Sequence, residues 1–237
     1  MVNTILAPVP ALRPVPLSAV MPNRRMFLKS GLAATALTAA SSLAEQTNNA
    51  PQPSAVQRKG RIHQSVSRGC YKQLTLDQLC ASAVQMGLKG IDLLNIEEFE
   101  VPRRYGLVCA MGYVGGGTIP DALNRTENHA AIEEAFRKNI PIAAKAGVPN
   151  VITFSGNRRG MSDEEGARNT IAGLNRLKKI AEDNGVNICL ELLNSKRNHH
   201  DYMADHTAWG ARVMREVNSA RVKLLYDIYH MQIMEGD

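Results

Sequence analysis

Short buried-strand candidates alternate with amphipathic helices along most of this chain of 237 residues. We expect strands at residues 62–66, 90–94, 107–111, 150–154, 186–191 and 222–230. Strands and helices joined by short connections in this repeated order are typical of parallel β/α units. An open flavodoxin-like sheet would also fit the alternation, but no early glycine-rich nucleotide loop is present. Acidic residues end the late strands, and this favours a (β/α)8 TIM barrel of the α/β class.

The length of the chain sets how much of such a barrel it can contain. A complete eight-stranded barrel takes about 250 residues. Only 177 residues follow position 60, which is enough for about six of the eight β/α units. We therefore expect residues 61–237 to form a barrel domain that is incomplete at its C-terminus. Strands one and six would then lack one neighbour each, which would favour aggregation or oligomerisation.

Positive charge is concentrated at the start of the chain. The formal net charge is +6, of which +5 lies in residues 1–60 and only +1 in the remaining 177 residues. A nucleic-acid-binding domain usually carries a basic surface of its own. The nearly neutral charge of the remaining residues therefore predicts no nucleic-acid partner.

The basic N-terminal segment has the features of an export signal. Residues 23–29 (Asn-Arg-Arg-Met-Phe-Leu-Lys) form a twin-arginine motif, and a weakly apolar run at 31–40 follows. That run is too short to span a membrane, so we expect no stable membrane anchor. Residues 42–44 have the small-x-small pattern that signal peptidase cleaves. We expect residues 1–60 to be a twin-arginine signal peptide and flexible linker, with export to the periplasm; a surface arginine pair before an ordinary helix is the alternative.

The cysteines and a glycine-rich loop indicate no special chemistry. None of Cys70, Cys80, Cys109 and Cys189 belongs to a C-x-x-C pair, so a zinc knuckle or thioredoxin motif is not indicated. An even count permits disulfides, but Cys109 and Cys189 lie in strand candidates, where buried free thiols are expected. The loop at 112–117 lacks a following Gly-Lys-Ser/Thr, and we expect a mobile rim loop rather than a phosphate site.

Two strand candidates deliver a carboxylate where they end. Side chains alternate along a strand, so Glu191 shares a face with Cys189, and Asp227 shares a face with Leu225. The C-terminal ends of barrel strands form the catalytic rim, and we expect both acids there. Two neighbouring carboxylates can hold a hard divalent cation, and one can move a proton next to a carbonyl that the cation polarises. Helix capping or ion pairing is the alternative for both residues.

The motifs around these acids resemble those of hydroxypyruvate isomerases, in the xylose-isomerase-like barrel superfamily of sugar isomerases and epimerases. They are residues 191–194 (Glu-Leu-Leu-Asn), 202–210 and 224–237, with support from 64–67 and 155–158. The resemblance covers roughly residues 61–237. It implies interconversion of hydroxypyruvate and tartronate semialdehyde, with Glu191 as a catalytic acid/base. It also implies that Glu191 and Asp227 bind Mg²⁺ or Mn²⁺, with a His or Gln and a second Glu from strands seven and eight.

Two further residues are candidates for substrate binding. His230, three residues after Asp227, has the spacing of a substrate-binding histidine in related ketose epimerases, although a hydrogen-bonded rim histidine fits equally well. The guanidinium fork of Arg158 suits the carboxylate of hydroxypyruvate, and a solvated loop arginine is the alternative.

We therefore expect an exported, metal-assisted aldose–ketose isomerase in which Glu191 takes a proton beside the carbonyl and an enediolate forms. Its partner would be a small hydroxy-keto acid or sugar. A sugar epimerase or dehydratase on the same barrel and an inactive truncated barrel are the alternatives. A DNA-repair endonuclease shares the superfamily fold, but the nearly neutral domain and the lack of extra histidine ligands argue against it. The sequence leaves the oligomeric state open, a homo-oligomer included.

Overall fold

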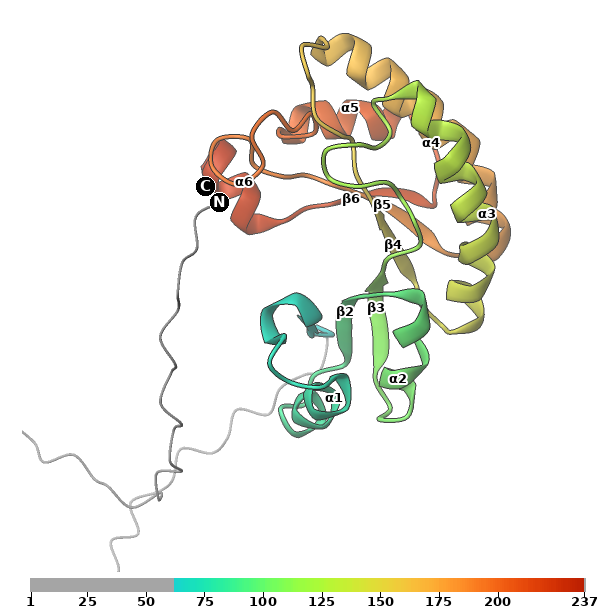
Figure 1. Ribbon diagram of the computed structural model, residues 1–237, viewed down its shortest axis with the longest axis vertical. Coiled ribbons are helices and arrows are strands. Elements are labelled where there is room, and N and C mark those ends of the chain that lie inside the picture. The colour runs from blue at the N-terminus through green and yellow to red at the C-terminus, as the bar shows by residue number, and fades with distance from the viewer. Residues whose placement is uncertain (1–61, 237) are drawn as a thin grey trace, which may run out of the picture. The chain divides into compact units, whose positions relative to one another are not determined.

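The computed structural model describes residues 62–236, which form a parallel sheet accompanied by helices (Figure 1). Its strands are β1 (Ser65–Ser67), β2 (Gly90–Leu94), β3 (Val108–Gly112), β4 (Asn150–Thr153), β5 (Asn187–Glu191) and β6 (Val222–Leu225). The α-helices are α1 (Leu76–Gln85), α2 (Glu100–Arg103), α3 (His129–Lys145), α4 (Asp163–Asn184), α5 (Thr207–Val217) and α6 (Ile228–Glu235). Short 3-10 turns are η1 (Arg68–Tyr71), η2 (Ile96–Glu98) and η3 (Thr126–Asn128).

The strands lie in the sheet in chain order, from β1 to β6, and every neighbouring pair is parallel. Each crossover therefore advances in the same direction, and right-handed crossovers then place their helices on one face. On that face α3 packs against α4, and α4 packs against α5. A flavodoxin-like sheet would have its first strand between the second and third. The observed order excludes that alternative and confirms the TIM barrel architecture for the described residues.

The hydrophobic core lies between the sheet and the helices. Ile91, Val151 and Ile188 come from three different strands and are fully buried. Phe136 on α3 and Leu174 on α4 are likewise fully buried in the same cluster. Burial of each such side chain contributes about 1.5–3 kcal/mol. This layer fixes the strands, so their other face can carry polar side chains.

Polar side chains form a ladder at the N-terminal ends of the strands. Arg221 donates to the side-chain oxygen of Asn187 (3.2 Å), whose amide nitrogen donates to Asn150 Oδ1 (2.9 Å). Asn150 in turn donates to the backbone oxygen of Ala110 (2.8 Å). The ladder therefore ties β3 to β6 at the end of the barrel that usually serves stability rather than catalysis.

Several predicted boundaries were wrong. The first strand begins at Ser65 rather than at residue 62, and the sixth ends at Leu225. Residues 228–230, predicted as strand, belong to α6. Helix α5 has His206 as its N-cap residue, and the preceding Asp205 binds other side chains. Local capping by Asp227 decides the start of α6, whereas Asp205 is bound by Arg158, 47 residues away in the sequence.

The glycine-rich loop after β3 is anchored to β4. The hydroxyl of Thr153 donates to the backbone oxygen of Gly116 (2.8 Å). A Cβ atom on Gly116 would lie 2.6 Å from the backbone oxygen of Ile152, so only glycine allows this approach. The loop is therefore held at its centre.

The structure tests the prediction on the cysteines but does not describe the predicted leader. All four cysteines are free thiols; Cys70 is exposed and the other three are buried, as expected for the pair in β3 and β5. Within residues 62–236 no helix is both long and apolar enough to cross a bilayer. The predicted signal peptide and linker lie outside the described residues.

Candidate active site

Glu191 and Asp227 lie at the C-terminal ends of β5 and β6. Glu191 pairs with Leu225 in the register of the two strands, and Asp227 follows two residues later. Burial, together with the negative charge of Asp227, raises the pKa of Glu191 from 4.5 to about 7. A carboxyl group with this pKa exists in both protonation states near neutral pH, which suits a group that takes up and returns a proton.

Asp227 also begins the helix that follows it. Its Oδ1 atom accepts hydrogen bonds from the backbone nitrogens of Tyr229 (2.8 Å) and His230 (3.3 Å). The capping alternative therefore holds for this oxygen. The Oδ2 atom lies 3.8 Å from His230 Nε2, and the carboxylate side chain is about one-third exposed. The cap thus orients the carboxylate and leaves Oδ2 for a ligand.

His230 lies beside Asp227 on the first turn of α6. Asn194 Nδ2 is 2.5 Å from His230 Nδ1, and an amide NH₂ group can only donate in this contact. The ring proton is therefore on Nε2, the atom that faces Asp227. Burial lowers the pKa of His230 despite the opposing charge of Asp227. The histidine is therefore a neutral N–H donor at the rim, although only 8% of the residue is exposed.

Tyr113 is a further candidate for the site, which sequence reasoning missed. It follows β3 directly and is held by a backbone hydrogen bond to Leu94 (2.8 Å). Burial raises the pKa of its phenol, and the negative charge of Glu191 raises it further. The phenol is thus a neutral donor within the electrostatic reach of Glu191. Its place at the end of a predicted strand was the available signal.

The carboxylates of Glu191 and Asp227 fit a hard divalent cation in chemistry. Carboxylate oxygens are the ligands that Mg²⁺ and Mn²⁺ prefer, and a cation would relieve the repulsion that raises the Glu191 pKa. Among residues 62–236, no group of three or more His, Cys, Asp or Glu side chains could hold a metal ion. Glu191 and Asp227 are therefore the candidate ligands among the described residues.

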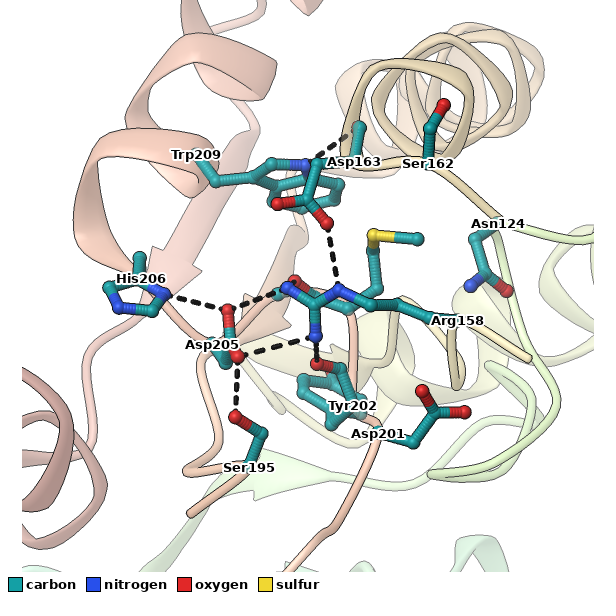
Figure 2. A network of polar contacts seen from close by, with 12 residues as sticks. Asn124, Arg158, Ser162, Asp163, Ser195, Asp201, Tyr202, Asp205, His206 and Trp209 are labelled. Atoms are coloured by element: carbon teal, nitrogen blue, oxygen red, sulfur yellow. Dashed lines mark hydrogen bonds and ion pairs between the residues drawn. The ribbon is translucent and has the colours of Figure 1, made fainter. Parts of the chain in front are cut away.

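Arg158 lies in a network between the loops after β4 and β5 (Figure 2). Its Nε atom donates to Asp163 (2.7 Å), and its two terminal nitrogens bind both oxygens of Asp205 (3.0 and 3.2 Å). The same nitrogens also donate to the backbone oxygens of Tyr202 and Met203. These contacts use all five N–H groups of the guanidinium.

The network gives Arg158 a structural place. Its side chain is 22% exposed, so it is not the solvated loop arginine that was the alternative. No N–H group remains for a substrate carboxylate. The geometry therefore does not support the predicted contact between Arg158 and substrate. The other three predicted residues, Glu191, Asp227 and His230, lie at the same rim.

Comparison with known proteins identifies the fold family. Residues 100–237 match the family described as xylose isomerase-like TIM barrel. A D-psicose 3-epimerase from Agrobacterium fabrum is 34% identical over 65 residues, which are 27% of this chain and 22% of that protein. The match thus spans about a fifth of the curated relative.

Solved structures with the same fold are more distant in sequence. An AP endonuclease of family 2 from Brucella melitensis has a TM-score of 0.60 at 17% identity, over 74% of this chain and 72% of its own. A 3-keto-D-glucoside 4-epimerase from E. coli has a TM-score of 0.60 at 19% identity, over 75% and 72%. The IOLI protein with a bound zinc atom has 0.60 at 15%, over 74% and 66%. The family match covers more than half of the sequence, and this chain belongs to the xylose isomerase-like TIM barrel family.

Proposed function

We propose that this protein catalyses proton transfer at a carbon next to a carbonyl in a small hydroxy-keto substrate, as an isomerase or epimerase. One observation carries the proposal: Glu191 is a partly buried carboxyl group with a pKa of about 7 beside Asp227, at the ends of adjacent barrel strands. Such a carboxylate can remove a proton at neutral pH and return it to a neighbouring atom.

The residues around Glu191 have distinct roles in this proposal. Asp227 and Glu191 would hold a divalent cation, Mg²⁺ or Mn²⁺, which when bound polarises the substrate carbonyl. The zinc atom in the IOLI structure supports a metal in this fold. His230 would donate its Nε2 proton to a substrate oxygen, since Asn194 occupies Nδ1. Tyr113 would offer its phenol at the same rim.

Two substrate classes agree with this chemistry. The motif resemblance favours isomerisation of hydroxypyruvate to tartronate semialdehyde, through an enediolate. The match to a D-psicose 3-epimerase favours epimerisation of a neutral ketose. The geometry of Arg158 also favours a neutral substrate, because its five donors are already bound to protein acceptors.

Solvent deuterium exchange separates these substrates. The full chain is incubated in D₂O with Mn²⁺ and either hydroxypyruvate or D-psicose, and deuterium at the carbon next to the carbonyl is followed by NMR. We expect deuterium incorporation with one of the two substrates. The rate of incorporation should be at least about a hundredfold lower in Glu191→Gln. Glu165→Gln, which removes the same charge at an exposed position on α4, should be fully active. No incorporation with either substrate, or equal rates in Glu191→Gln, would refute the proposal.

We also propose that the protein is exported by the twin-arginine route to the periplasm. The motif Asn23-Arg24-Arg25 and the apolar run after it support this. A reporter fused to residues 21–60 should reach the periplasm only when the twin-arginine translocase is present. Replacing Arg24 and Arg25 with lysine should retain the reporter in the cytoplasm, and undiminished export of that variant would reject the assignment.

A further inference from the structure

The backbone at Glu191 has an unusual neighbour in the sheet. Residues 150–153 of β4 pair with 187–190 of β5, and Asn187 donates its N–H to the backbone oxygen of Pro149 (2.9 Å). Hydrogen bonds repeat every two residues on each strand of a parallel pair. The ladder would therefore continue past the paired residues with a bond from Ser155 N–H to Glu191 C=O.

The phenol of Tyr202 takes the place of that bond. The Ser155 N–H donates to the Tyr202 hydroxyl (3.0 Å), and the hydroxyl donates to the backbone oxygen of Glu191 (2.9 Å). Burial keeps the pKa of this phenol far above neutral, so the hydroxyl has one proton to donate. One inserted oxygen thus satisfies both groups of the interrupted rung.

Tyr202 is itself held on several sides. The residue is fully buried, and its backbone N–H donates to the backbone oxygen of His199 (3.0 Å). Its backbone oxygen accepts a hydrogen bond from Arg158, the residue at the centre of the loop network (Figure 2). The phenol therefore enters the sheet from a fixed segment and not from a free loop.

The peptide group that follows Glu191 is consequently fixed at both of its ends. Its oxygen accepts from Tyr202, and its nitrogen, on Leu192, donates to the backbone oxygen of Leu225 in β6 (3.1 Å). The orientation of this peptide sets the direction in which the Glu191 side chain leaves the strand. A small rotation would move the carboxylate away from the site beside Asp227.

We propose that Tyr202 is a positioning residue for Glu191, because its phenol replaces the last rung between β4 and β5 and fixes the Glu191 backbone. This inference rests on the proposed function, in which Glu191 transfers the proton. Arg158 then acts indirectly, by holding the backbone of Tyr202. Tyr202 thus contributes to catalysis without contact with substrate.

The substitution Tyr202→Phe in the full chain tests this role, since it removes only the hydroxyl. We expect kcat to fall roughly tenfold to a hundredfold, the size of effect that small misplacement of a reacting group produces. KM should change less than about threefold, because the residues expected to contact substrate remain. The amide of Ser155 should exchange with solvent at least about a hundredfold faster, since it loses its acceptor.

A destabilised control separates positioning from general loss of stability. Phe136 is fully buried on α3, and Phe136→Leu or Phe136→Val can be chosen to match the melting temperature of Tyr202→Phe. The control should change neither kcat nor Ser155 exchange. Equal loss of kcat in the control, or wild-type kcat in Tyr202→Phe, would overturn the inference.

The failure of the proposed function would be distinguishable from the failure of this inference. Full activity in Glu191→Gln would reject the function alone. The position of Glu191 is then followed by NMR coupling constants about χ1, which need no turnover. We expect one rotamer in the wild type and rotamer averaging in Tyr202→Phe. A single unchanged rotamer, with unchanged Ser155 exchange, would overturn the role of Tyr202 whatever the activity.

Discussion

Arg158 and Asp205 form a two-pronged ion pair that joins the loop after β4 to the loop after β5, with N···O distances of 3.0 and 3.2 Å. The Asp205 side chain is only 6% exposed. Burial alone would raise its pKa, but hydrogen bonds from Arg158, Ser195 and His206 outweigh burial and hold the pKa below its usual value. The carboxylate is therefore charged and depends on its partners.

Removing Arg158 should be costly for stability. Arg158→Ala leaves a buried carboxylate without its cation, and we expect a loss of about 3–5 kcal/mol in the free energy of unfolding. Arg158→Lys should recover only part of this, because an ammonium cannot reproduce the planar fork. Arg168→Ala on α4 breaks an exposed pair with Glu164 and should cost under about 1 kcal/mol. Urea denaturation measures all three, and equal losses in Arg158→Ala and Arg168→Ala would contradict the structural role.

Glu191 should make stability depend on pH in the metal-free protein. Its pKa is about 7 when folded against a reference of 4.5, so between these values the folded state binds more protons. The contribution of Glu191 to the free energy of unfolding is then fully present below about pH 4.5, and it falls by about 3 kcal/mol as the pH rises to 7. Glu191→Gln should lack this fall. Denaturation curves across pH 4–8 in the presence of a chelator measure the difference, and parallel profiles for the two proteins would contradict the raised pKa.

Asp227 should contribute to cation binding without being needed for the fold. Asparagine is also a good N-cap residue, so Asp227→Asn should preserve α6. We expect Mn²⁺ at pH 8 to raise the melting temperature of the wild type and to have a much smaller effect on the variant. Asp183→Asn, an exposed substitution of equal charge, should respond like the wild type. An equal response in Asp227→Asn would exclude Asp227 as a ligand.

The sequence predicts the architecture better than it predicts the partners of each polar residue. Alternating strands and helices are local patterns, so the barrel and the placement of Glu191 at a strand end could be derived from them. The partners of Arg158 lie up to 47 residues away, and no local pattern indicates them. The same holds for Tyr202, whose role depends on the register of β4 and β5.

The misassigned end of β6 has a different cause. Residues 226–230 (Tyr-Asp-Ile-Tyr-His) are aromatic and β-branched, which favours a strand. Asp227, the second residue of this segment, instead caps α6, and its hydrogen bonds from the backbone nitrogens of Tyr229 and His230 decide the outcome. Capping by a single carboxylate therefore overrides the propensity of its neighbours.

The ladder at the N-terminal ends of the strands should affect stability but not catalysis. Asn187 accepts from Arg221 and donates to Asn150, so Asn187→Ala removes two hydrogen bonds and leaves Asn150 Oδ1 without its donor. We expect a loss of about 1–3 kcal/mol in the free energy of unfolding. Because Glu191 lies at the opposite end of β5, kcat should stay within about twofold of the wild type.

Asn184→Ala provides the matched control for this substitution. Asn184 makes a single hydrogen bond within its own helix, to the backbone oxygen of Ile180 (2.8 Å), and should cost less than Asn187→Ala. Denaturation and steady-state kinetics of both variants complete the comparison. A large fall in kcat for Asn187→Ala at unchanged stability would show that the ladder transmits its effect to the rim. A stability equal to that of the wild type would show that Arg221 and Asn150 find other partners.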